Sequence, residues 1–473
     1  MIISLPESMA ELKDFLVHLD KTLQDRITEI ARRYYQAILE EVDEALARYR
    51  GSKLQIEHQR AVWYQTCLGP VRINRREYRD RNGGGKGERY CLLDNLMGMS
   101  KYNHTTVRVQ ELALETASQM PYRRSAEVLR KTSALNLAHQ TIWRMVARSA
   151  DPHIAKERQE LQWFLETGEI PQGEGKQVAR LMVEADGVIL SLQREKERKA
   201  EVKLGIAYEG WEKVGQDRYR TVNKTIFASV DSQAQFWPGL SLKLERTYDL
   251  SRIKDTVVGG DGAGWIKEGV SYVGGRYQLD RYHLHKELCS AFGRDKQIKG
   301  RIWRACERGD VAAALEILAE ALKKARGDAS LRIARVARYL QENSSGIGDY
   351  RLGLGAECQD LRHTGAIEGN IDKLIVRRMK NQGMSWTLKG ISRLLCVRFL
   401  VLEQKLTSWL EKEKQPQIES LSVIPRRKVR RIVTRLSTRE PDDWVKARLP
   451  ALYGPHASRP WVKALKSLSE VFA

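Results

Sequence analysis

Three acidic residues lie far apart in the sequence, each at a position from which it could enter a shared site. Asp186 is inside the apolar run VEADGVIL (183–190), Asp261 follows an apolar stretch in VVGGDGAGW, and Glu368 begins a helix-like stretch in GAIEGNIDKLIVRRMKNQG. A buried carboxylate is costly unless it is paired, and a metal ion is one such partner. Oxygen ligands suit Mg²⁺ and Mn²⁺, and two such ions can promote phosphoryl transfer. We therefore predict that these residues are catalytic and bind two metal ions.

Each acid by itself also has a structural explanation. An Asp between glycines usually forms a turn, and an acid at a helix start usually acts as a cap. Glu184 shares a strand face with Asp186, so it could support the site unless a bulge turns it away. Asp280 and His283, in LDRYHLHK, could orient DNA or support the metal ligands from a strand end, or simply form structural hydrogen bonds.

The charge of the chain indicates a polyanionic partner. The 473 residues contain 81 Lys and Arg against 60 Asp and Glu, a formal charge of +21, and nucleic acid is the leading candidate. Six cysteines without a Cys-x-x-Cys pair argue against a zinc finger or a disulfide framework. The start MIISLPESMAELKD lacks the features of a secretory signal, and no long charge-free apolar run occurs. We expect a cytoplasmic, nucleoid-associated protein.

A helix-turn-helix pattern indicates where DNA could bind. In YRRSAEVLRKTSALNLAHQTIWRMVAR (122–148), a first helix is expected over 125–131, a turn over 132–136, and a second helix from about Ala138. Ile142, Met145 and Val146 would face inward, leaving the polar side of the second helix for base edges. Similar hairpins also occur in protein cores. The predicted DNA contacts here and after Glu368 are Arg123, Arg124, His139, Gln140, Arg144, Arg148, Arg377, Arg378 and Lys380. Trp265 and Trp386 could stack on an unpaired base or pack in the core.

The elements that must position these residues follow from the hydrophobic pattern. Apolar residues three and four apart predict one long helix over 8–50, which could join two chains or pack on its own domain. Residues 59–92 predict a basic β-hairpin with its tip at NGGGKG (82–87). Strands are expected at 179–193, 201–214, 218–232, 255–266 and 275–288, the first three as an antiparallel meander, with a helix around 240–244. This order matches an RNase H-like α/β core by analogy.

The remaining segments complete the predicted domain organisation. Residues 286–345 have a helical pattern and suggest an insertion in the core, and the basic tail contains PRRKVRR (425–431), either a solvated face or a DNA clamp. The expected domains are an N-terminal long helix (1–58), a hairpin and helix-turn-helix region (59–150), the first part of the core (179–285), the helical insertion (286–345), the end of the core (346–410) and a basic C-terminal region (411–473).

Four stretches together resemble the ISLre-type insertion-sequence transposases of bacteria, which are more distantly related to the Mutator-like group. They are EADGVILSLQREKERKAEVKLGIAYEGWEKV, VVGGDGAGWIKEG, YQLDRYHLHKEL and GAIEGNIDKLIVRRMKNQGMSW, within roughly residues 40–400. The resemblance implies an Asp-Asp-Glu core on an RNase H-like fold, with Asp186, Asp261 and Glu368 as the three acids. Their separations are 75 and 107 residues, and the second leaves room for the helical insertion.

The expected function is therefore that of a Mg²⁺- or Mn²⁺-dependent DNA transposase. It would bind the inverted-repeat ends of its element, cut there, and join the freed 3′-hydroxyl to target DNA. Bringing two ends together implies at least a dimer. The alternatives are a non-catalytic DNA-binding protein, such as a repressor or domesticated transposase, and a structure-specific nuclease with the same metal core.

Overall fold

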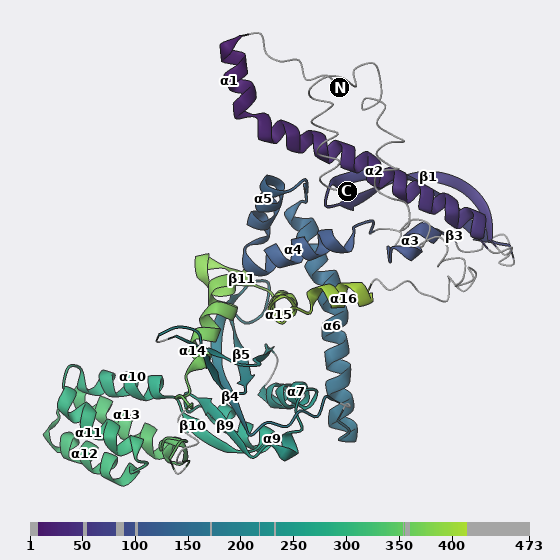
Figure 1. Ribbon diagram of the computed structural model, residues 1–473. Helices are drawn as coiled ribbons and strands as arrows, with labels where there is room; N and C mark the ends of the chain where they lie inside the picture. The colour runs from purple at the N-terminus through teal and green to yellow at the C-terminus, as the bar shows by residue number, and fades with distance from the viewer. Residues whose placement is uncertain are drawn as a thin grey trace. The chain divides into compact units, whose positions relative to one another are not determined.

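The computed structural model describes residues 8–50, 54–81, 89–99, 103–170, 173–216, 218–230, 233–352, 354 and 360–413. The chain divides into two compact units, shown in Figure 1. One unit contains the residues up to Thr116, Tyr122–Ile142 and the residues from Lys405 on, and the other contains Ala117–Pro121 and Trp143–Gln404. The predicted hairpin tip at 82–87 and the PRRKVRR run lie outside the described residues.

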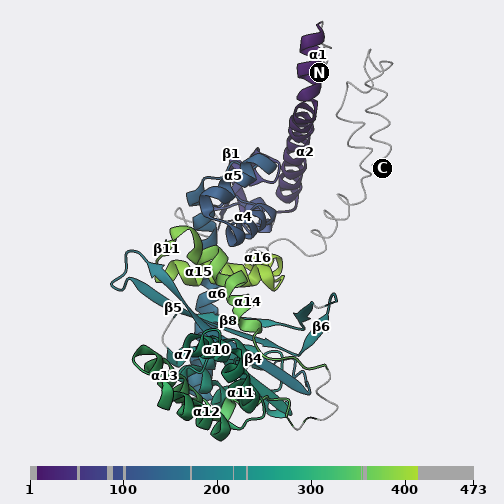
Figure 2. The ribbon, with the colours of Figure 1, turned by 90° about the vertical axis from the view of Figure 1, so that its left-hand side faces the viewer.

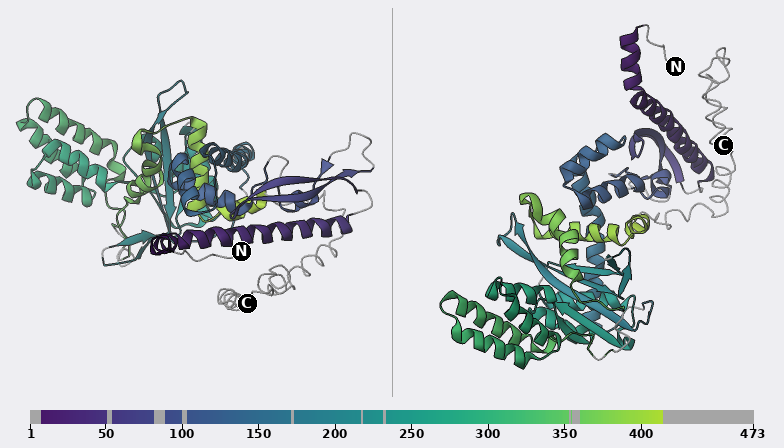
Figure 3. Two further views of the ribbon diagram at one scale, coloured as in Figure 1. Left: turned by 90° about the horizontal axis from the view of Figure 1, so that it is seen from above. Right: turned by 60° about the vertical axis from the view of Figure 1, so that its left-hand side comes forward.

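The first unit begins with a long helical segment that breaks once. The prediction of a helix over 8–50 is confirmed as α1 (Met9–Val17) and α2 (Leu19–Tyr49), which are separated at His18. The C-terminal half of α2 lies along an antiparallel ribbon, as Figure 3 shows, and contributes Leu46 to its apolar core. The ribbon consists of β1 (Leu54–Thr66) and β2 (Gly69–Asp80), followed by β3 (Arg89–Tyr90) and α3 (Leu92–Leu96).

Acidic side chains of α2 satisfy the backbone of β2. Glu40 accepts the N–H of Asn74 at 3.0 Å, and Asp43, which is fully buried, accepts the N–H of Arg76 at 3.2 Å. Unpaired strand N–H groups can recruit other strands, so these bonds stabilise the strand edge. The predicted basic hairpin is confirmed: β1 and β2 pair antiparallel around a tight turn at Cys67–Leu68, and β2 also pairs antiparallel with the short β3. The predicted tip at 82–87 connects β2 to β3 in the sequence and lies outside the described residues.

The helix-turn-helix pattern corresponds to two helices with the expected exposure. After α4 (Val107–Gln119), α5 spans Tyr122–Thr132 and α6 spans His139–Thr167. Ile142, Met145 and Val146 are buried as predicted. However, α6 is much longer than a recognition helix requires. Helix-forming Glu, Gln, Lys and Leu residues extend it to Thr167.

A mixed sheet forms the centre of the second unit. Its strand order is β10-β9-β4-β5-β8, with β11 also beside β4. β4, β9 and β10 are parallel, whereas β5 is antiparallel to β4 and β8. The expected meander of the first three strands is confirmed. The strands are β4 (Arg180–Leu192), β5 (Lys199–Tyr208), β8 (Thr225–Ser229), β9 (Asp255–Gly260), β10 (Arg276–Leu279) and β11 (Ser385–Trp386).

Four predicted strands are shorter than expected. The strand predicted over 255–266 ends at Gly260, because Gly262, with a φ of +103°, turns the chain and Gly264–Lys267 forms a helix, α8. The strands predicted over 201–214 and 218–232 are each interrupted. The end of the first and the start of the second form a separate two-stranded ribbon, β6 (Trp211–Lys213) and β7 (Tyr219–Thr221). The strand predicted over 275–288 ends at Leu279, because Asp280 caps a helix that begins at Arg281. Alternating apolar residues in YHLHKEL are compatible with either structure, and the cap decides between them.

Two apolar cores hold the sheet, one on each face. On one face, Val188, Leu204 and Ile206 pack against α15 (Leu388–Leu402) and the helical segment that carries Glu368. That segment is α14 (Ala366–Ile371), which continues as a π-helix over Asp372–Lys380. On the other face, Val183 and Ala207 pack against α7 (Gln233–Glu245), α8 (Gly264–Lys267) and α9 (Gly269–Val273).

The predicted helical insertion is a four-helix group with its own core. It contains α10 (Arg281–Phe292), α11 (Lys296–Glu307), α12 (Val311–Lys324) and α13 (Asp328–Glu342). Figure 1 shows these helices beyond β10, and Figure 2 shows them gathered in one group. Leu284, Ile302, Leu318 and Leu340 are buried in this core. The insertion begins at Arg281, slightly before the predicted position. The last described helix is α16 (Leu406–Glu413), so nearly all of the predicted basic region (411–473) lies outside the described residues.

Candidate active site

The strand register places acidic residues at one level across three parallel strands. Glu184 in β4 is paired with Gly259 in β9, an offset of 75 residues, which is also the separation of Asp186 and Asp261. The β9–β10 register pairs Gly260 with Leu279, and Asp280 follows directly. Continued by two residues, this register places Asp186 level with Asp261 and Asp280, which directly follow β9 and β10, whereas β4 itself continues to Leu192. The carboxyl ends of parallel strands are a common place for ligand sites in α/β proteins.

The local environment of Asp186 opposes its ionisation. Burial and the negative charges of Asp261 and Glu368 together raise its pKa to about 6, against the lowering effects of the Gly187 N–H and the charge of His283. The Gly187 N–H donates to the Asp186 carboxylate at 2.7 Å. Repulsion among carboxylates is the condition that a divalent cation relieves.

Backbone groups and a tyrosine hold Asp261. Its Oδ1 accepts the N–H of Ala263 at 2.9 Å, which orients the carboxylate in the loop after β9. The hydroxyl of Tyr339, on helix α13 of the insertion, donates to the Asp261 carbonyl at 2.6 Å. The helical insertion therefore helps to fix the loop that carries the second predicted acid.

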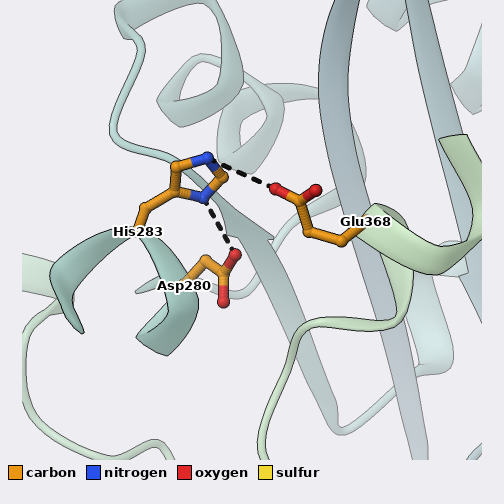
Figure 4. A group of neighbouring side chains, drawn as sticks. All are labelled: Asp280, His283 and Glu368. Carbon is orange, nitrogen blue, oxygen red and sulfur yellow. Dashed lines mark hydrogen bonds and ion pairs between the residues drawn. The ribbon is translucent and has the colours of Figure 1, made fainter. Parts of the chain in front are cut away.

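A histidine joins Glu368 to Asp280. His283 Nδ1 lies 3.0 Å from Asp280 Oδ2, and His283 Nε2 lies 3.3 Å from Glu368 Oε1, as Figure 4 shows. Asp280 also accepts the N–H of Tyr282 at 3.0 Å and so caps α10. Asp280 therefore forms the structural hydrogen bonds that were one of its two predicted roles, and the support of metal ligands stays a prediction. The hydrogen bond with Asp280 raises the pKa of His283, and the charges of Asp280 and Glu368 act in the same direction, against burial.

The donor set of this cluster fits a divalent cation. Ligand atoms of Asp280, His283 and Glu368 all lie within 4.8 Å of one another, which is the geometry of a potential metal site. Among the described residues, Asp186 and Asp261 are not part of that close group, although their charges influence it. Together with Asp186 and Asp261, the site has four carboxylates and the imidazole of His283. Its net charge is therefore negative. Carboxylate oxygens suit Mg²⁺ and Mn²⁺, and an imidazole is compatible with Mn²⁺.

The sequence did not indicate how Glu184 is used. Its side chain is 1% exposed, and burial raises its pKa. It accepts hydrogen bonds from the Tyr208 hydroxyl and from the N–H groups of Gly365 and Ile367, the latter two at 3.0 Å. It is therefore directed toward the start of α14 and away from solvent. Its sharing of a strand face with Asp186 was visible in the sequence, but its partners nearly two hundred residues later were not.

The predicted DNA contacts differ in their accessibility. Arg377 and Lys380 are exposed, although Arg377 pairs with Asp372 at 2.7 Å. Arg378 is 2% exposed and donates to the Ala117 carbonyl at 3.0 Å, so the prediction that it contacts DNA phosphates is wrong. On α5 and α6, six predicted contacts are exposed: Arg123, Arg124, His139, Gln140, Arg144 and Arg148.

The two tryptophans considered for base stacking serve packing. The Trp265 ring packs against Phe236 and lies beneath the ammonium of Lys203, 4.3 Å from the ring centroid. Trp386 donates its Nε1–H to the Met379 carbonyl at 2.7 Å and lies beside the buried Arg378. Both rings are only partly accessible, so core packing accounts for them.

The fold and the site define a mixed α/β protein with a carboxylate–histidine cluster at the ends of its parallel strands. The chain belongs to the uncharacterised protein family UPF0236, whose model matches residues 12–415. A UPF0236 protein of Caldanaerobacter subterraneus subsp. tengcongensis is 26% identical over 384 residues, covering 80% of this chain and 75% of that relative. A second from the same organism is 24% identical over 384 residues, covering 80% and 76%.

The name of the first relative combines eleven locus designations from one strain, and other members of the family occur in the same genome. Among the described residues, none of the helices has the length and apolar character needed to cross a bilayer.

Proposed function

We propose that this protein is a DNA transposase of an insertion sequence, cutting and joining DNA through Asp186, Asp261 and Glu368. The observation that carries the proposal is the strand register, which brings Asp186 level with Asp261 beside a helix that presents Glu368. The five central strands, in the order β8-β5-β4-β9-β10, have three antiparallel and then two parallel members. This order supports an RNase H-like core for the unit that contains the site.

The proposed cofactors are two Mg²⁺ or Mn²⁺ ions held by Asp186, Asp261 and Glu368. When bound, such ions would lower the barrier to in-line phosphoryl transfer by activating the attacking oxygen and stabilising the leaving one. Other residues of the chain hold the proposed ligands in position. Asp280 orients His283, which can hold a proton at Nε2 beside Glu368. Tyr339 and the N–H of Ala263 fix the Asp261 loop.

The proposed partner is double-stranded DNA, both the inverted-repeat ends of the element and the target. The formal charge of +21 favours phosphate contacts, which supply most of the affinity for DNA. The N-terminal turns of α6 expose His139, Gln140 and Arg144, while Ile142 faces inward, an arrangement that suits major-groove contact. A protein with this partner would act in the cytoplasm, at the nucleoid.

The number of family members in one genome supports a mobile element. Eleven loci of one Caldanaerobacter strain share a single protein name, and similar proteins occupy further loci. Elements that copy or move themselves leave such repeated genes, whereas a repressor or housekeeping nuclease is usually encoded once or a few times. This distribution favours the transposase over the two alternatives.

We also propose that the protein acts as a homo-oligomer, at least a dimer, joined through α1 and the first half of α2. This segment carries large apolar side chains that are 40% or more exposed: Leu16, Leu23, Ile27, Ile30 and Tyr34. From Leu23 on they recur at spacings of three and four residues, so they share one face of α2, and Leu16 lies on α1 before the break at His18. Further along α2, Leu46 is buried and Leu39 and Val42 are partly buried against the ribbon, so that part of the helix already has an apolar partner within its own chain.

The test of the proposed function uses purified protein, labelled DNA carrying the ends of its own element, and Mg²⁺ or Mn²⁺. We expect metal-dependent nicking at the element end and transfer to a target duplex. Asp261→Asn and Glu368→Gln should abolish both while retaining end binding. Binding without cleavage under either metal would favour the non-catalytic alternative, and cleavage without strand transfer would favour the nuclease.

A further inference from the structure

Glu184 is a buried carboxylate whose two oxygens are both engaged. Its side chain is directed to the sheet face that packs against α14, and it is 1% exposed. One oxygen, Oε2, accepts the N–H groups of Gly365 and Ile367, both at 3.0 Å, and Oε1 accepts the hydroxyl of Tyr208 from the neighbouring strand β5. Burying a carboxylate is unfavourable unless its hydrogen bonds are satisfied, and here they are.

The start of α14 depends on these bonds. The first N–H groups of a helix have no acceptor within the helix and are usually capped by a nearby Ser, Thr, Asp or Asn side chain. The residue at this cap position is Gly365, which has no side chain to serve as the cap. Its φ of +132° is favourable only for glycine, and this conformation accompanies the hydrogen bond from its N–H to Glu184. A strand residue 181 positions earlier therefore supplies the cap.

The backbone opposite Glu184 is shaped to admit this side chain. Gly259 is its register partner on β9, and a Cβ on Gly259 would lie 3.1 Å from Glu184 Cγ and 3.3 Å from Thr364 Cβ. A larger residue would displace either the carboxylate or the segment leading into α14. The space that Gly259 leaves is therefore filled by the side chains of Glu184 and Thr364.

From this arrangement we infer that Glu184 is a positioning residue for Glu368. Ile367, whose N–H Glu184 holds, directly precedes Glu368, and Asp186 is two residues from Glu184 on the same strand face. One short stretch of β4 thus carries the proposed metal ligand Asp186 and, through Glu184, holds the backbone next to the proposed metal ligand Glu368. The role rests on the proposed function, in which Glu368 binds metal. It predicts that losing the acceptor oxygens of Glu184 weakens metal binding without affecting DNA binding.

Two substitutions separate this role from the alternatives. Glu184→Gln keeps an oxygen for the Gly365 and Ile367 N–H groups, and its amide can donate to the Tyr208 oxygen. Glu184→Met keeps an unbranched chain of similar length but offers no oxygen. We expect Glu184→Gln to retain Mn²⁺ affinity within about threefold and Glu184→Met to lose about 10- to 100-fold, the range found when residues that support metal ligands are removed.

The measurements are Mn²⁺ titration by calorimetry and hydrogen exchange of the 360–371 segment, both on the full chain well below its melting temperature. Glu184→Met should exchange faster there and bind Mn²⁺ more weakly, with unchanged affinity for element-end DNA and a lower kcat. If Glu184→Met fails to fold, Tyr208→Phe serves instead, because it removes only the hydroxyl and should change both quantities in the same direction to a smaller extent.

Four results would overturn the inference. Equal losses in Glu184→Gln and Glu184→Met would make the charge of Glu184 the important property, as for a direct metal ligand. A lower melting temperature with unchanged Mn²⁺ affinity would leave a purely structural role. Wild-type protein that neither binds Mn²⁺ nor cleaves would overturn the proposed function itself, and the positioning role with it. If the wild type is active and Glu184→Met is equally active, only the positioning role is overturned.

Discussion

Replacing Asp186 by Asn should stabilise the metal-free protein at neutral pH. Burial first, and then the charges of Asp261 and Glu368, raise the pKa of this carboxyl from 3.8 to about 6. Each pKa unit is worth about 1.4 kcal/mol, so the ionised carboxylate costs about 3 kcal/mol in the folded state. Asn removes the charge while its amide oxygen can still accept the Gly187 N–H.

The direction of the pH dependence follows from linkage. Between pH 3.8 and about 6 the folded protein retains a proton that the unfolded chain releases, so the free energy of unfolding falls as pH rises through this window. Above about pH 6 the folded protein bears the full free-energy cost of the ionised carboxylate. Asp186→Asn should therefore have little effect near pH 4 and raise the melting temperature at pH 7.5 by about 5–10 °C at most, for a unit of this size.

The assay is thermal unfolding at several pH values, with and without Mg²⁺. Added Mg²⁺ should stabilise the wild type and have much less effect on Asp186→Asn, since binding to the folded state alone shifts unfolding by mass action. A matched control is Asp349→Asn. There burial, which by itself would raise the pKa, is outweighed by hydrogen bonds from Arg351, and the pKa falls to about 2.

The control variant should behave in the opposite way. The ionised Asp349 contributes stability above pH 3.8 that is lost as pH falls toward 2, so Asp349→Asn should lower the melting temperature at pH 7.5. If Asp186→Asn instead destabilises the protein at pH 7.5 as Asp349→Asn does, or if Mg²⁺ stabilises both Asp186 forms equally, the proposed charge repulsion at this site is wrong.

Two further predictions concern stability and assembly. Arg378→Ala should lower the free energy of unfolding by about 1–3 kcal/mol, because it leaves the buried Ala117 carbonyl without its donor. Arg377→Ala should change it by less than about 0.5 kcal/mol; urea unfolding of the two variants measures the difference. Ile27→Glu should shift the protein toward the monomer, since this side chain is 66% exposed in the centre of the proposed helix contact. Light scattering coupled to size exclusion would show it, and an unchanged mass would place the contact elsewhere.

The sequence by itself determined the elements that have a clear period. The long N-terminal helix, the helices at 122–132 and from 139, the meander of three strands and the helical insertion all follow from apolar spacing that local geometry enforces. The three acids, too, were visible as carboxylates in apolar or glycine-rich contexts. Where the period was ambiguous, as in YHLHKEL after Leu279, the prediction of a strand was wrong, because a single capping residue decided for a helix.

Only the tertiary structure decided which side chains meet. The register of β4 with β9 sets Asp186 beside Asp261, and it cannot be read from either strand alone because any offset of two residues preserves the same alternation of faces. Likewise Arg378 and Arg377 are adjacent and chemically identical, yet one is buried against Ala117 and the other is exposed. Glu184 caps a helix that lies far away in the sequence. Such long-range pairings depend on how whole elements pack, and no local pattern of residues encodes them.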